Sequence, residues 1–109
     1  MLIDNLEKLL AAGQDSALLR YSLASAYQKG GDLERARAHL ARALEQDPAY
    51  SAAWKAYGKV LAALNETAAA AEAYENGIRV ANQNGDIQAA KEMGVFLKRL
   101  RKNADLGRS

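Results

Sequence analysis

The sequence predicts an all-α protein of about six helices that pack in pairs, and three observations support this fold class. The 109 residues include 24 alanines, one proline and few β-branched residues, a composition that favours helices over strands. A pattern of small and bulky residues repeats every 34 residues. Turn-forming and capping residues stand at the predicted helix ends. We expect one domain over residues 1–102, since a chain of this length does not build two cores.

The first helix is predicted within residues 1–13. Four leucines of this segment lie one period of 34 residues before the core positions of the second helix in the following repeat: Leu2, Leu6, Leu9 and Leu10. The chain therefore starts midway through a repeat, with a second helix that has no first helix before it.

The first full repeat is predicted over residues 17–50. Ser16 is suited to cap a helix that runs to about Lys29, and Gly30-Gly31 breaks it. Asp32 is suited to cap the next helix, which Pro48 closes. This segment is a helical pair.

The second full repeat is predicted over residues 51–84 and has the same plan. Ser51 is expected as the cap of its first helix and Asn65 at the turn between the two helices. Thr67 lies near the cap of the second helix, and a polar exit follows at residues 82–85.

A lone first helix is predicted over residues 86–102, once two extra residues are allowed in the preceding loop. Ala90, Met93, Gly94 and Leu97 then take the core positions of a first helix, and Gly94 takes the small position at a close helix crossing. Residues 103–109 are expected to form a flexible basic tail. Lone helices at both ends would cover the exposed faces of a stack of helical pairs.

This pattern resembles the tetratricopeptide repeat, and the resemblance covers nearly the whole chain. In that family the first helix of a unit carries a bulky residue, Leu, a small residue and Tyr, and the second carries Ala, an aromatic residue, Ala and Pro. The second repeat supplies Trp54, Tyr57, Gly58, Leu61, Ala70, Tyr74 and Gly77, and the first supplies Leu23, Ala24, Tyr27, Ala36, Leu40, Ala43 and Pro48. The resemblance implies a right-handed α-solenoid.

Catalysis, metals and cofactors find little support in the sequence. The chain has no cysteine and one histidine, His39, which we expect on the outer face of its helix. Gly30-Gly31 lacks the preceding strand and the Lys-Ser ending of a phosphate loop. We expect a protein that is not an enzyme and holds no cofactor. The ends show no leader and no apolar span, so we also expect a cytoplasmic protein without membrane contact.

The resemblance also implies a binding surface, because first helices line the concave face of such solenoids. At the positions of these first helices that line the concave face, six side chains are basic and none is acidic. This favours an acidic protein or peptide partner. A lysine-rich face that is merely solvated is the alternative. The expected groove residues are Leu18, Tyr21, Ser25, Gln28, Lys29, Lys55, Lys59, Gln88, Lys91, Val95, Lys98 and Arg99.

Two other functions are alternatives to peptide binding in the groove. Met93, Phe96 and Leu100 lie at helical spacing on the side that a following repeat would cover, so they either fold back onto the preceding repeat or form a homodimer surface. Nucleic-acid binding is less favoured, because the basic C-terminal residues have no aromatic platform beside them. Residues 91–109 hold six basic and two acidic side chains, against nine and eleven in residues 1–90.

Overall fold

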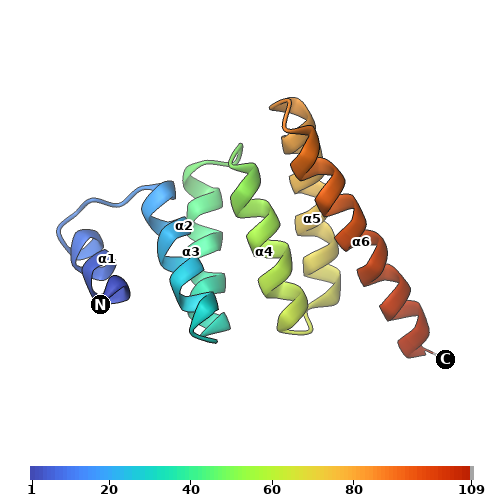
Figure 1. The fold of residues 1–109 in the computed structure, drawn as a ribbon, viewed down its shortest axis with the longest axis horizontal. Coiled ribbons are helices and arrows are strands. Elements are labelled where there is room, and N and C mark those ends of the chain that lie inside the picture. Colours follow the sequence, from blue (N-terminus) through green and yellow to red (C-terminus); the bar gives the residue numbers. More distant parts are fainter. Residues whose placement is uncertain (109) are drawn as a thin grey trace.

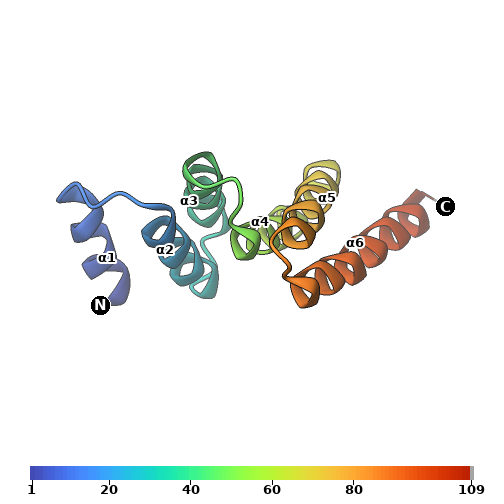
Figure 2. The same ribbon diagram turned by 90° about the horizontal axis from the view of Figure 1, so that it is seen from above.

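The computed structural model describes residues 1–108, and it consists there of six α-helices in a row (Figure 1). The helices are α1 (Leu2–Ala11), α2 (Ala17–Lys29), α3 (Leu33–Gln46), α4 (Ser51–Ala63), α5 (Thr67–Gln83) and α6 (Ile87–Arg108). Seen from above, α2, α4 and α6 lie on one side and α3 and α5 on the other, while the two termini lie at opposite ends of the long axis (Figure 2). The stack measures 49 × 31 × 19 Å. The prediction of an all-α solenoid of helical pairs is confirmed.

Local signals set most helix ends as the sequence predicts. The Ser16 hydroxyl accepts a hydrogen bond from the Leu19 amide at 3.1 Å, and the Asp32 carboxylate accepts one from the Arg35 amide at 3.1 Å. These bonds satisfy amide groups that a first helical turn leaves without a partner. Asn65 takes the left-handed conformation, with φ of 63°, at the turn between α4 and α5.

Ser51 is not the cap of α4 but its first residue. The Asp47 carboxylate accepts a hydrogen bond from the Ala49 amide at 3.1 Å, so the turn around Pro48 closes early and Tyr50 occupies the cap position. The Ser51 hydroxyl instead donates to Asp86 at 3.2 Å. It thereby ties α4 to the start of α6.

Trp54 connects the parts of the hydrophobic core. Its ring packs against all three clusters of buried residues, and its indole N–H donates to the Pro48 carbonyl at 2.8 Å. Leu23, Leu40, Val60 and Met93 are the largest side chains that are fully buried. The core thus runs through both repeats, and Trp54 lies between its halves.

Small residues allow the close helix crossings, with one exception. A methyl group on Gly58 would meet the Tyr74 ring, with Cδ1 at 2.6 Å, and one on Gly77 would lie 2.8 Å from the Trp54 Cβ. A methyl group on Gly94 would have no atom within 4 Å. The prediction that Gly94 lies at a close crossing is wrong, because its crossing partner would be the second helix of a further repeat.

The last helix is longer than the sequence suggested. α6 continues from Lys102 to Arg108, so residues 103–108 are helical and do not form a flexible tail; Ser109 lies outside the described residues. Ala104 is half-buried and lines a hollow together with Thr67 and Ala71 of α5. The absence of proline in this segment lets the helix continue.

His39 is not on the outer face of α3. Its ring stacks on Tyr27 at a centroid distance of 5.6 Å, and Arg20 and Glu7 lie beside its two nitrogens at 3.2 and 3.6 Å. Burial, followed by the positive charge of Arg20, lowers the pKa of His39 against the weaker opposing effect of Glu7. His39 faces inward because it follows Ala36 by one helical turn and shares its face.

Candidate functional site

The predicted groove residues lie on α2, α4 and α6, the three helices that form one side of the molecule (Figure 2). They do not form one continuous basic surface. Lys29, at the end of α2, borders a hollow with the N-terminal residues of α1, far along the stack from the basic side chains of α6. Tyr21 packs against Tyr50 with ring centroids 5.1 Å apart. The basic residues of α4 and α6, in contrast, meet.

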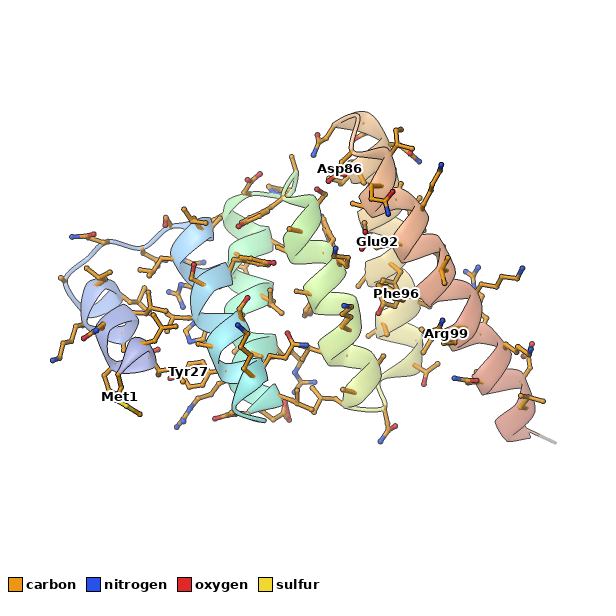
Figure 3. All side chains as sticks on the ribbon, viewed as in Figure 1. Met1, Tyr27, Asp86, Glu92, Phe96 and Arg99 are labelled. Atoms are coloured by element: carbon orange, nitrogen blue, oxygen red, sulfur yellow. The ribbon has the colours of Figure 1, made fainter. Side chains whose placement is uncertain are left out.

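A carboxylate that the sequence analysis did not count lies between α4 and α6. Glu92 accepts a hydrogen bond from the Lys55 ammonium at 2.9 Å and another from the Gln88 amide at 3.3 Å (Figure 3 labels Glu92). The bonds from Lys55 and then Gln88 lower the pKa of Glu92. Lys55 is therefore neutralised within the chain. Glu92 is absent from the predicted groove residues because it falls between two of their positions on α6, Lys91 and Val95.

Lys59 and Phe96 form the next contact along the same two helices. The Lys59 ammonium lies 4.9 Å from the centroid of the Phe96 ring, a cation–π distance. On its other side Phe96 packs against Tyr74, with ring centroids 5.9 Å apart and a tilt of 45°. Phe96 therefore points into the space between α4 and α6 and not toward the open end of the stack.

A hollow of about 240 Å³ lies beside this contact. Lys59 and Arg99 contribute positive charge to its lining, while Phe96, Tyr74 and Leu100 contribute apolar surface (Figure 3 labels Phe96 and Arg99). The complete lining is Lys59, Ala62, Tyr74, Phe96, Arg99, Leu100 and Asn103. A cleft with an apolar floor and two cationic side chains suits a ligand that carries an apolar group next to a carboxylate.

The remaining predicted residues of α6 lie elsewhere. Val95 and Lys98 line a shallow surface with Lys102 further along the same helix, and Arg99 borders both this surface and the hollow. Val95 is 54% exposed. The structure thus brings Lys59 and Arg99 together at the hollow, and it places Val95 and Lys98 beside Arg99 on the neighbouring surface, which Lys59 does not line.

The residues considered for self-association are largely used within the chain. Met93 is fully buried, and its thioether lies where a side chain on Gly77 would be. Leu100 is half-buried and packs against two buried clusters, one of α5 and α6 and one of α4 and α5. These contacts, together with those of Phe96, show that the three side chains fold back onto the preceding repeat. The alternative of a homodimer surface does not hold for Met93, because this side chain is fully buried.

Across residues 1–108 no helix combines the length and the apolar character that a membrane span needs. The described side chains include no group of three or more His, Cys, Asp or Glu residues placed to hold a metal ion.

Comparisons with known proteins agree with this architecture. A family model described as tetratricopeptide repeat matches residues 3–50 and 21–87. A TPR repeat-containing protein of Pseudomonas aeruginosa is 52% identical over 100 residues, which cover 92% of this chain and 95% of that protein.

Solved structures show the same likeness. A protein of Bordetella parapertussis, solved in solution, has a TM-score of 0.85 and 40% identity, covering 97% of this chain and 92% of its own. The Sgt2 TPR domain of Aspergillus fumigatus has a TM-score of 0.82 and 30% identity, covering 98% of this chain and 70% of its own. The chain belongs to the tetratricopeptide repeat family.

Proposed function

We propose that this protein is a non-enzymatic interaction module that binds an acidic segment of a partner protein between α4 and α6. Proteins of this family are typically modules that bind proteins or peptides. The observation that supports the acidic character is the hollow in which Lys59 and Arg99 stand over an apolar floor. A cytoplasmic location is part of the proposal, since a chain without cysteine suits a reducing compartment.

The two cations and the apolar floor have separate tasks in this proposal. An exposed ion pair contributes only about 0.2–1 kcal/mol, so Lys59 and Arg99 alone cannot reach the roughly 8 kcal/mol of micromolar binding. Their charge steers an acidic segment toward the groove and sets its position. An aromatic or aliphatic side chain of the partner, packed on Phe96, supplies the larger apolar contribution.

Lys55 does not belong to the binding residues in this proposal. Its ammonium is already paired with Glu92, so a ligand carboxylate would have to compete with that pair. Lys59 has the ring of Phe96 beneath it, so its ammonium can turn toward a ligand carboxylate by giving up a cation–π contact.

The test uses a labelled peptide that contains several glutamates around one phenylalanine, with fluorescence anisotropy as the readout. We expect binding at low salt that weakens as ionic strength rises, because exposed charges are screened over about 8 Å at physiological salt. Lys59→Glu is expected to weaken binding about tenfold or more, because it reverses a charge within the site. Phe96→Ala is expected to weaken binding and to leave its salt dependence in place.

Lys8→Glu is the matched control, because it makes the same change of net charge on α1, away from the groove. Binding should be nearly unchanged in this variant. Equal losses for Lys8→Glu and Lys59→Glu would contradict the proposal, since the peptide would then respond only to the total charge.

The alternative functions have less support. Homodimerisation through Met93, Phe96 and Leu100 would need side chains that the chain already uses for its own packing. For nucleic acid, Arg101 of the basic C-terminal segment is paired with Glu75 at 3.0 Å, which reduces the charge available to phosphates.

A further inference from the structure

A further hollow, of about 230 Å³, lies between α4 and α5 and has no lining residue in common with the hollow beside Phe96. Its residues on α4 follow one another at spacings of three and four, which places them on one face of that helix. The complete lining is Trp54, Tyr57, Leu61, Ala69, Glu72, Ala73 and Asn76. The volume is below the roughly 300–1,000 Å³ of pockets for drug-sized ligands, so the hollow suits a single side chain.

Two aromatic rings line this hollow. Trp54 and Tyr57 are half-buried, with ring centroids 6.5 Å apart and a tilt of 58° between the ring planes. The indole N–H of Trp54 donates to the Pro48 carbonyl at 2.8 Å, which restrains the orientation of the ring. Leu61 and Ala73 are 3% and 2% exposed, so they close the hollow on the side of the core. Aromatic rings held in place in this way attract a cation.

Glu72 is the one charged side chain in the described lining of this hollow. It is exposed, and it has no hydrogen bond or ion pair among residues 1–108. Two other carboxylates of the same segment are paired: Glu66 lies 3.9 Å from Arg37, and Glu75 lies 3.0 Å from Arg101. The carboxylate of Glu72 is therefore available to a ligand.

A guanidinium of the chain already stands at the edge of this hollow. Arg79 donates to the side-chain carbonyl of Asn76 at 3.3 Å. It follows Glu72 by two helical turns, about 10 Å along α5, and forms no ion pair with it. Arg79 thus leaves the carboxylate and the two rings unoccupied, although its positive charge opposes the entry of a second cation.

We propose that this hollow binds an arginine side chain that a partner protein presents. A guanidinium is planar and weakly hydrated, so it packs on aromatic rings, and its fork of N–H groups donates to both oxygens of a carboxylate. Trp54 and Tyr57 supply the rings, and Glu72 supplies the carboxylate. A lysine ammonium is compact and strongly hydrated and makes no planar contact of this kind. The site therefore favours arginine over lysine.

The proposal is independent of the groove between α4 and α6, because the two hollows share no residue. The groove takes negative charge next to an apolar group, whereas this hollow takes a positive charge. Each of the two sites can therefore be tested without the other.

The test titrates the full chain with three blocked tripeptides, in which arginine, lysine or citrulline stands between two glycines. Citrulline has the shape of arginine without its charge. Trp54 is the only tryptophan in the sequence, so its fluorescence reports on this hollow, and heteronuclear NMR shows which amides shift. We expect the arginine peptide to bind and to shift amides of α4 and α5. The lysine peptide should bind several-fold more weakly, and the citrulline peptide should not bind.

Three variants test the parts of the site. Glu72→Gln keeps the size of the side chain and removes its charge, so it should weaken binding about tenfold. Ala69→Leu fills the hollow from an exposed helical position, so it should prevent binding at little cost to the fold. Arg79→Gln removes the neighbouring positive charge and should strengthen binding.

Glu75→Gln is the matched control, because it makes the same change on the same helix at a carboxylate that does not line the hollow. Its binding should equal that of the unmodified chain, and circular dichroism should show that all variants keep the fold. An arginine peptide that shifts no amide of α4 or α5 at any concentration would overturn the proposal. So would equal binding of the citrulline or lysine peptide, or equal losses in Glu72→Gln and Glu75→Gln.

Discussion

Replacing glycine by alanine at Gly58 and at Gly94 should change stability in opposite directions, although the chemical change is the same. Both glycines lie inside helices, and they occupy equivalent positions in α4 and α6. Alanine is favoured over glycine within a helix by about 0.5–1 kcal/mol, and this gain applies at both sites. Any difference between the variants therefore reports the space around the new methyl group.

The space differs completely between the two sites. At Gly94 the methyl group meets no atom within 4 Å, so the full propensity gain of roughly 0.5–1 kcal/mol should appear. At Gly58 it would lie 2.6 and 2.7 Å from Cδ1 and Cζ of Tyr74, whose ring is held in the core. Such overpacking costs about 1–3 kcal/mol, which exceeds the gain.

Thermal and urea unfolding followed by circular dichroism would measure both effects. For a domain of this size 1 kcal/mol corresponds to roughly 4–8 °C, so Gly94→Ala should raise Tm by about 2–8 °C and Gly58→Ala should lower it. Low protein concentration keeps association from contributing to Tm. A lower Tm for Gly94→Ala would refute the open crossing site on α6. A higher Tm for Gly58→Ala would refute the close crossing of α4 and α5. The same reasoning predicts that Gly94→Leu is tolerated.

Three further outcomes are expected. Trp54→Ala should cost about 3–5 kcal/mol, since the ring joins all three core clusters, and an unchanged Tm would contradict that role. Asp32→Ala should cost about 1 kcal/mol through loss of the cap on α3, whereas Asp32→Asn, measured by urea unfolding, should retain most of the stability. Because the pKa of His39 is lowered in the folded state, the unfolded chain binds its proton first, so stability should decline as pH falls below the ordinary value of 6.5. In His39→Phe this part of the pH dependence of unfolding should disappear, and its persistence would assign it to other groups.

The sequence alone determined where the helices are and how they pair. Ser16 and Asp32 act through hydrogen bonds to amides three residues away, and Asn65 acts through its own backbone conformation. Such signals are local, so they can be recognised without knowing the rest of the fold. The period of 34 residues determined which helices form a pair, because close crossings require small residues at Ala24 and Gly58.

Only the tertiary structure decided what the groove and the ends of the stack contain. Lys55 and Glu92 are 37 residues apart, and their pairing depends on how far α4 lies from α6 and on the rotation of each helix about its axis. The same rotation directs Phe96 toward Tyr74 and leaves Gly94 without a neighbour. A residue pattern shows which side of a helix faces the core, but only to within a broad arc. An ion pair or a ring contact depends on helix positions to within a few ångströms and on a single side-chain rotamer. For this reason the paired helices followed from the residues, while the partner of each groove side chain required the packed structure.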